Sequence, residues 1–254
     1  MHSEIHAPAP ASLEAILRLR WRALKLRYGR NRAEILAARR ILRAGQTAVD
    51  AGAHKGAWTW WLQDRVGTAG RAIAFEPQTE LAESLQACAT RLRWHHVRVA
   101  AFALSSRSGT GRLSVPRPGS PGARLVASPS PQTRDVPLIA LDDWFASAKV
   151  LPPAFIKADC EGHEPELLLG ARGILESARP ALLLELEVRH LGRERFHATL
   201  DHLAALGYHG TFFNHGLEQP LSSFRIRLHQ RETAGAFWKA PDYCNNFLFR
   251  AARS

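Results

Sequence analysis

A glycine-rich turn next to an acidic residue, Asp50-Ala51-Gly52-Ala53 followed by Gly56, has the composition of a ligand-binding loop. Gly52 and Gly56 allow the backbone to approach a ligand closely, and a helix that begins after them offers unpaired N–H groups to an anion. The spacing is not the dinucleotide pattern G-x-G-x-x-G, because His54 stands where its second glycine would fall. Since many glycine turns are only tight connections, a second signal is needed.

That second signal is Glu76, which follows Phe75 at the end of the next apolar stretch, 26 positions after Asp50. In nucleotide-binding α/β folds an acid at this strand tip accepts hydrogen bonds from both ribose hydroxyls. The alternative is a surface glutamate that precedes the turn at Pro77. Together with the glycine turn, the sequence favours ribose binding.

A third cluster places Asp159, Glu161 and His163 on the turn where a buried strand leaves the sheet. Carboxylates at this edge lie over the ligand crevice, where one can remove a proton from an acceptor. Two alternatives stay open: Asp159 and Glu185 hold a divalent ion, or the acids only orient a cofactor amino group. We predict no metal, because the sequence offers no clear set of three ligands.

Short apolar strands alternating with amphipathic helices must position these clusters. This alternation predicts a doubly wound α/β fold with parallel strands and helices on both faces. Strands are expected at 47–51, 71–75, 97–104, 136–140, 154–159, 181–187, 208–213 and 246–250. Helices are expected after residue 55 and at 79–91, 142–145, 165–176 and 195–206.

Residues 105–132, rich in Gly, Pro, Ser and Arg, interrupt this alternation and predict an inserted hairpin or a mobile loop. Acceptor pockets in such folds are assembled from loops and insertions rather than from sheet-edge motifs. We therefore expect this insertion, the N-terminal leader and residues 209–240 to form the acceptor site.

The leader, residues 1–45, carries a charge of +7 out of +11 for the 254-residue chain. It predicts two helices, one at 13–28 and one from Asn31 to near Gly45, with Glu34 completing a capping-box-like pair. The apolar stripe of the first helix should rest on the main domain; it comprises Leu13, Ile16, Leu17, Trp21, Leu24 and Tyr28. The basic residues either mark an anionic partner (nucleic acid, phospholipid surface or acidic glycan) or form a solvated helix face.

The length and apolar content predict one main domain, residues 46–254, without disulfide or metal support. The three cysteines, Cys88, Cys160 and Cys244, are too widely spaced for a disulfide framework or a zinc motif, which favours a cytoplasmic setting. No stretch is apolar enough to span a membrane.

The motifs D-A-G-A-x-x-G, F-E-P and I-K-A-D-C-E-G-H-E, with Leu182–Glu185, resemble the FkbM family of class I methyltransferases over residues 47–250. This resemblance implies a seven-stranded, mostly parallel sheet whose last strand is antiparallel, with S-adenosyl-L-methionine as cofactor. It further implies methyl transfer to a hydroxyl of a sugar, glycan or secondary metabolite.

Carried over by position, the resemblance places Asp159 and Glu161 at the mouth of the site. From their place at the strand end, Asp159, Glu161 and His163 are the catalytic candidates. The cofactor-binding candidates are Asp50, Gly52, Ala53, Gly56, Glu76, Pro77, Ala103 and Asp159. Relatives often show Asn before Ala-Leu near the third strand end, where this chain has Phe102.

Two rival functions differ in class. An RNA methyltransferase would use the basic leader to hold the RNA backbone, and its binding would weaken steeply with salt. A binding protein that retains only the fold is disfavoured, because Asp50, Glu76 and Asp159 are acids that are costly to bury without a use.

Overall fold

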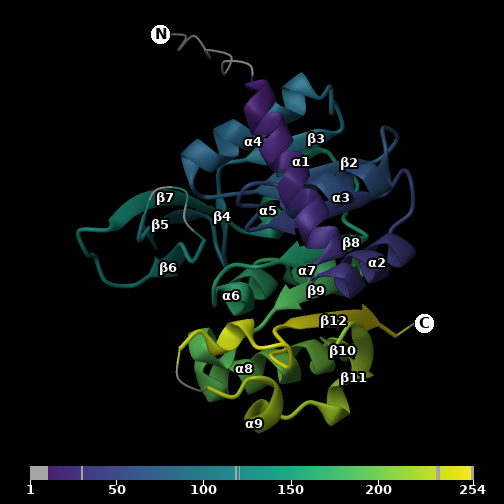
Figure 1. Cartoon of the computed structure of the whole chain (residues 1–254), viewed down its shortest axis with the longest axis vertical. Coiled ribbons are helices and arrows are strands. Elements are labelled where there is room, and N and C mark those ends of the chain that lie inside the picture. The colour runs from purple at the N-terminus through teal and green to yellow at the C-terminus, as the bar shows by residue number, and fades with distance from the viewer. Residues whose placement is uncertain (1–10, 30, 118, 120, 233–234, 253–254) are drawn as a thin grey trace.

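The computed structural model describes residues 11–29, 31–117, 119, 121–232 and 235–252. Seven of the expected strands and one further strand form a mixed sheet of eight, whereas the strand expected at 136–140 belongs to a second sheet. The order across the sheet is β11 (Leu217–Pro220), β10 (Tyr208–Asn214), β12 (Asn246–Ala251), β9 (Ala181–Glu185), β8 (Phe155–Ala158), β1 (Thr47–Ala51), β2 (Arg71–Phe75) and β3 (Val97–Ala100). The strands from β3 to β9 are parallel, and β12 runs antiparallel to β9 (Figure 1). The parallel sheet and the antiparallel last strand are therefore confirmed.

The expectation of seven strands is wrong, because β11 adds an eighth at the edge. It follows β10 through a two-residue turn in which His215 (φ 48) and Gly216 (φ 75) both have positive φ. Turns of this kind match the twist of paired strands and so make tight hairpins. The His-Gly pair was the sequence signal for this strand.

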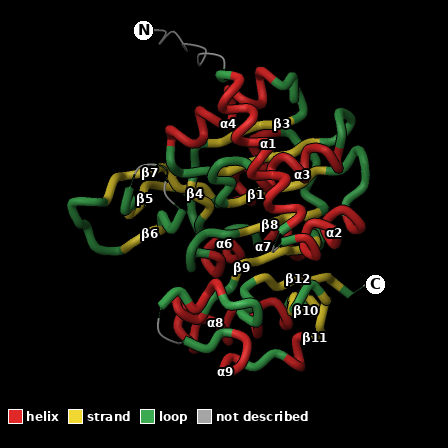
Figure 2. Tube along the Cα trace, viewed as in Figure 1, coloured by secondary structure: helices red, strands yellow, loops and turns green. Residues whose placement is uncertain are grey.

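Helices cover both faces of the sheet, as Figure 2 shows. On one face lie α2 (Arg32–Ile41), α3 (Ala57–Val66) and α4 (Thr79–Arg91). On the other lie α5 (Leu141–Ala148), α6 (Glu164–Leu169), α7 (Arg172–Ser177) and α8 (Val188–Ala205). The short α9 (Ile226–His229) lies in the segment between β11 and β12.

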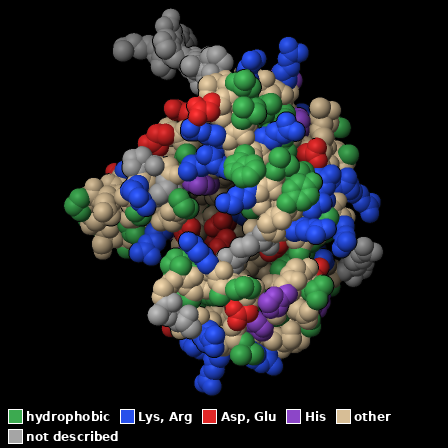
Figure 3. All heavy atoms as spheres, viewed as in Figure 1, with side chains coloured by type: hydrophobic (Ala, Val, Ile, Leu, Met, Phe, Trp, Pro, Cys, Tyr) green, Lys and Arg blue, Asp and Glu red, His purple; other side chains and the backbone are tan. Residues whose placement is uncertain are grey.

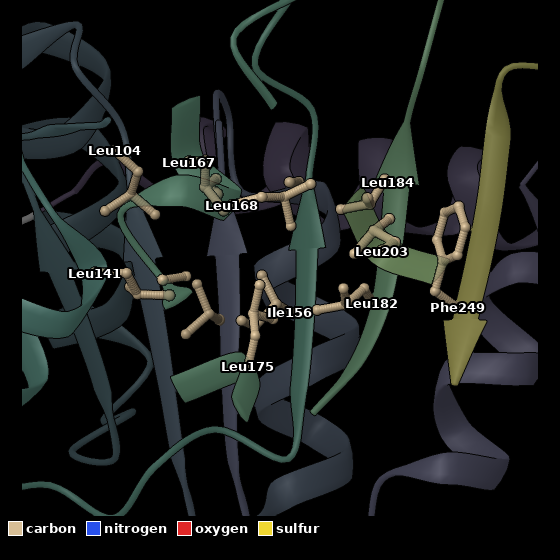
Figure 4. Close-up of a cluster of buried hydrophobic side chains, with 14 of the residues drawn as sticks. Leu104, Leu141, Ile156, Leu167, Leu168, Leu175, Leu182, Leu184, Leu203 and Phe249 are labelled. Carbon is tan, nitrogen blue, oxygen red and sulfur yellow. The ribbon is translucent and has the colours of Figure 1, made fainter. Parts of the chain in front are cut away.

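Alternate residues of each central strand supply the two hydrophobic cores. Ile156 and Leu182 face the α5–α8 side, where Figure 4 shows them beside Leu203 and Phe249. Phe155, the preceding residue of β8, belongs to the core beneath α2 and α3. A strand buried on both faces reads as a continuous apolar run, which explains why the sequence pattern located β8 and β9 correctly.

The insertion, together with the residues that flank it on both sides, forms a second sheet that projects from the side of the main sheet (Figures 1 and 2). Its strands are β4 (Ala103–Leu104), β7 (Thr133–Ile139), β5 (Gly109–Ser114) and β6 (Arg124–Val126). The hairpin interpretation is confirmed by the antiparallel pairing of β5 with β6. The single strand expected at 97–104 is wrong: it divides into β3 and β4, and β4 pairs with β7 in the second sheet.

The first leader helix, α1 (Leu13–Tyr28), begins with the Ser12 side chain accepting a hydrogen bond from the Ala15 N–H. It packs against α3 through Leu19 and Ala23, which are buried. The predicted packing stripe is wrong for four of its six residues: Leu13, Leu17, Trp21 and Tyr28 are all exposed. The helix has two apolar faces, and the sequence alone did not show which one lies inward.

The second leader helix is α2, whose Ile35 and Ala38 are buried in the core beneath the sheet. Asn31 precedes it without making a side-chain cap hydrogen bond, so that half of the expected capping box does not form. None of the helices in the described part of the chain has the length and apolarity that crossing a bilayer requires.

Candidate active site

The carboxyl ends of β1, β2 and β8 meet at one edge of the sheet, facing the second sheet across a cavity. The cavity and its open mouth together enclose about 700 Å³. Its walls are formed by Gly52, His54, Glu76, Pro77, Gln78, Phe102, Ala103, Leu104, Leu113, Pro121, Gly122, Ala123, Leu125, Asp159, Cys160, Glu161 and His163. Figure 3 shows acidic side chains recessed in a hollow near the middle of the molecule.

Gly52 lies in the cavity wall at a position where no side chain fits. A Cβ at this position would lie 1.9 Å from the carbonyl oxygen of Asp159, and φ is +72°. The N–H groups of Gly52 and Ala53 both donate to the Phe75 carbonyl, at 3.0 and 2.9 Å. These bonds join the end of β1 to the end of β2, and the Asp159 N–H, which donates to the Ala51 carbonyl at 3.1 Å, joins the end of β8 to β1.

Three predicted cofactor residues of this loop lie outside the cavity wall. Ala53 is buried in the core beneath α1, and a Cβ on Gly56 would lie 2.3 Å from Leu85. Asp50 lies behind the loop and accepts a hydrogen bond from the Thr59 hydroxyl at 2.6 Å. Its other oxygen, Oδ1, is buried with no hydrogen-bond partner among the described residues, and burial raises the pKa of Asp50.

Glu76 is held in the cavity wall by backbone groups. Its carboxylate accepts the N–H of His54 at 2.7 Å and the N–H of Gln78 at 2.8 Å, and it is 3% exposed. Burial raises the pKa of Glu76, and the two hydrogen bonds act in the opposite direction. Since a carboxylate has about four acceptor positions, two remain for a pair of hydroxyl groups.

The second sheet and the residues just before it form an apolar wall of the cavity. Phe102, Ala103 and Leu104 line the cavity together with Leu113 and Leu125. Such a wall suits a flat aromatic ring such as adenine.

Gly119 joins the insertion to the main sheet. Its N–H donates to the Gln78 side chain at 3.2 Å, and its carbonyl lies 3.2 Å from His54 Nε2. The insertion, expected to contribute to the acceptor site, therefore also closes over the predicted cofactor side of the cavity.

Lys157 connects the strand-end acids, although the sequence reading had not selected it. Its side chain is 3% exposed, and Nζ lies 3.2 Å from Asp159 Oδ2. Burial alone would lower the pKa of Lys157, but Asp159, Asp50 and Glu185 together hold it above its usual value. The available signal was a lysine within the otherwise apolar strand β8.

Glu161 projects into the cavity from a strained turn. Its φ is +52°, in the left-handed region that a residue with a side chain seldom adopts. Burial, and after it the charge of Asp159, raises the pKa of Glu161 to about 7. A carboxyl group that titrates near neutrality is suited to accept a proton during catalysis.

His163 also lines the cavity, with both ring nitrogens near protein groups. Nε2 lies 3.0 Å from the Ser105 hydroxyl, and Nδ1 lies 3.5 Å from Glu166 Oε2. Burial lowers the pKa of His163, which favours the neutral ring. These contacts suit a residue that positions the turn.

Glu164, which sequence reasoning did not select, holds the turn that carries Glu161. It is 1% exposed and accepts the N–H groups of Cys160 at 2.6 Å and Gly162 at 3.1 Å. Burial raises the pKa of Glu164 to about 8. An acid directly before Pro165 at a helix start was the signal for this role.

A second, polar cavity opens beyond the end of β9, and Glu185 is the residue in it that the sequence had suggested as a possible metal ligand. Glu185 accepts a hydrogen bond from Asn245, and burial together with Asp159 raises its pKa well above the usual value. Glu187 accepts from Arg189 and, at 2.6 Å, from Tyr243. Although burial acts in the opposite direction, these bonds lower the pKa of Glu187 to about 2.

No group of three or more His, Cys, Asp and Glu side chains suited to hold a metal occurs among the described residues. The acids at this edge are instead in contact with Lys157, with backbone N–H groups and with amide side chains.

Comparison with protein-family models matches residues 50–209 to the methyltransferase FkbM domain. The chain belongs to the FkbM methyltransferase family. This membership confirms the resemblance drawn from the motifs, and S-adenosyl-L-methionine is the cofactor of this class of enzyme. No curated protein matches the sequence.

Solved structures of FkbM-like and related folds are similar at low identity. The methyltransferase FkbM of Methylobacillus flagellatus KT is 16% identical with a TM-score of 0.51, over 94% of this chain and 56% of its own. The O-methyltransferase of Bacillus cereus, solved with SAH, is 12% identical with a TM-score of 0.51, over 99% and 94%. The chain thus spans about half the length of the M. flagellatus protein, and these similarities establish the class I methyltransferase fold.

Proposed function

We propose that this FkbM-family chain transfers a methyl group from S-adenosyl-L-methionine to a hydroxyl oxygen of a sugar, glycan or secondary metabolite. The observation that carries the proposal is Glu161, whose pKa of about 7 belongs to a carboxyl group in the same cavity wall as Glu76. One cavity therefore combines a ribose-type acceptor of hydrogen bonds with a group able to remove a proton.

The cavity residues fit the cofactor. Glu76 has two acceptor positions for the ribose hydroxyls, and Phe102, Ala103 and Leu104 provide an apolar slot for the adenine. Gly52 forms a side-chain-free floor beside Asp159, where the methionine part binds. When bound, S-adenosyl-L-methionine supplies a methyl group already activated by its sulfonium.

The protein's own contribution is to align the acceptor oxygen and to remove its proton. Glu161 is the general base. Asp159 is less suited to this role, because it is already engaged by Lys157, whose Nζ lies 3.2 Å from Asp159 Oδ2. Asp159 and Lys157 instead fix the charge around the methionine part, and Glu164 holds the turn on which Glu161 stands.

The acceptor binds at the polar cavity beyond β9, next to the leader and the 209–240 segment. The leader contributes Gly29, Asn31 and Arg32 to the polar cavity beyond β9, and residues of the 209–240 segment line it as well: Phe213, His215, Gly216, Trp238 and Lys239. Carboxylates and amides at this location suit an acceptor rich in hydroxyl groups. The three free cysteines accord with a cytoplasmic setting.

The test measures methyl transfer from labelled S-adenosyl-L-methionine to a panel of hydroxylated acceptors, with cofactor binding followed by calorimetry. For an accepted substrate, the initial rate should rise about tenfold per pH unit below the Glu161 pKa of about 7 and level off above it, because only the carboxylate accepts a proton. A parent protein that binds no cofactor would refute the proposal. A rate that is flat across this pH range would remove Glu161 as the base.

A further inference from the structure

The leader helix α1 presents a row of large apolar side chains to solvent. Leu13, Leu17, Trp21 and Tyr28 are between 54% and 73% exposed, and Leu24 between them is half-buried. At 3.6 residues per turn these five side chains fall within an arc of about 80°. Leu19 and Ala23, which pack against α3, lie on the opposite side of the helix.

Basic residues border this exposed stripe on both sides. Arg20 and Arg27 follow one edge, and Arg18 and Lys25 the other, as the helical spacing dictates. Figure 3 shows hydrophobic side chains along the front of the molecule where α1 lies, with basic side chains around them. With Arg22 and the single acid Glu14, which pairs with Arg18, the helix carries a net charge of +4.

We infer that α1 is a membrane-surface helix that docks the protein on an anionic phospholipid bilayer. A helix lying in the interface buries its apolar face among the acyl chains and directs Lys and Arg toward the lipid phosphates. Trp21 and Tyr28 have the aromatic character favoured at that depth, where one end of the side chain is apolar and the other is wet.

The charge distribution on α1 disfavours two other partners for this surface, a second copy of the chain and an RNA. A second copy of this helix would bring two rows of like charge together on each side of the apolar seam. An RNA backbone would neutralise the arginines and leave the apolar side chains in water. Only an anionic lipid surface accommodates both the stripe and its basic borders.

The docked helix also holds part of the active-site region near the membrane. α1 ends at Tyr28, and the following residues Gly29, Asn31 and Arg32 line the polar cavity beyond β9. Docking therefore keeps the rim of that cavity close to the lipid surface. The inference itself rests on α1 alone and does not depend on the methyl donor or the acceptor.

The experiment is co-sedimentation of the full chain with phosphatidylcholine vesicles that contain or lack phosphatidylserine. We expect binding only with phosphatidylserine, weakening as salt is raised. The double variant Leu17→Ser/Trp21→Ser should reduce the affinity for vesicles by about tenfold or more, because it removes two large apolar side chains from the interface. Arg20→Glu/Lys25→Glu should abolish binding, because it removes the net positive charge of the helix.

The matched control is Leu151→Ser/Leu217→Ser, which removes two apolar side chains that are 74% and 64% exposed elsewhere on the surface. It should bind vesicles as the parent does, and circular dichroism should show all variants folded. The inference is overturned if the parent binds no vesicles, or if Leu17→Ser/Trp21→Ser binds them unchanged. It is equally overturned if light scattering shows a dimer that this variant dissociates, or if only RNA binds.

Discussion

Glu76 and Glu161 lie in the wall of one cavity, yet their surroundings prepare them for different tasks. Glu76 is held by two backbone N–H groups, whereas Glu161 stands on a strained turn near Asp159. Burial raises the pKa of both carboxyl groups, but two backbone N–H donors oppose this effect at Glu76, whereas the charge of Asp159 adds to it at Glu161. Under the proposed function, Glu76 is the binding acid and Glu161 the reacting acid, and their immediate neighbours separate these two roles at one sheet edge.

The sharpest test of this difference is Glu161→Gln, which removes the base and retains the shape. We expect the rate of methyl transfer to fall by roughly 100-fold to 10,000-fold, the usual contribution of a general base, with cofactor affinity near that of the parent. Initial rates and calorimetry separate the two effects. Glu176→Gln, an exposed position on α7, is the matched control, and full turnover in Glu161→Gln would assign the proton transfer to another group.

The next largest effect concerns Lys157, the buried cation among the acids at the sheet edge. Lys157→Met leaves Asp159, Asp50 and Glu185 without their common partner and should lower the free energy of unfolding by about 3–5 kcal/mol. Urea denaturation measures this loss. Lys149→Met, at an exposed position, should be nearly neutral; equal stability of the two variants would mean that the acids are neutralised in another way.

On the binding side, Glu76→Ala should weaken cofactor affinity by about tenfold to 100-fold, because two hydrogen bonds to a charged group are lost. Calorimetry with S-adenosyl-L-methionine and with its demethylated product gives the affinities. Glu80→Ala, on the exposed side of α4, should bind as the parent does. Parent-like affinity in Glu76→Ala would remove this residue from the ribose site.

The smallest effect on cofactor affinity is expected from the exposed apolar stripe of α1, which we propose has no part in cofactor binding. Leu17→Ser/Trp21→Ser should leave cofactor affinity unchanged, since these side chains point away from the main domain. Deleting residues 1–45 is the poorer test, because Ile35 and Leu42 belong to the core and their loss would destabilise the fold. A cofactor affinity that falls in the double variant would show that α1 contributes to the pocket.

Much of the site was predictable because it lies where strands end. Asp50, Glu76 and Asp159 follow apolar runs, and parallel strands bring their carboxyl ends to one edge. Lys157 and Glu164 were overlooked because their importance comes from burial and from contacts with backbone N–H groups. The sequence also did not show that Asp50 and Gly56 lie outside the cavity wall. Their positions depend on contacts with Thr59 and Leu85, respectively.

The sequence by itself determined the fold class, the family and the positions of the three acidic clusters, because these depend on local periodicity and on spacing within single segments. Tertiary structure decided which face of α1 packs against α3, how the second sheet covers the cavity through Gly119, and where β11 joins the sheet. These features depend on contacts between segments far apart in the chain, and two apolar faces of one helix remain equivalent until a neighbour buries one of them.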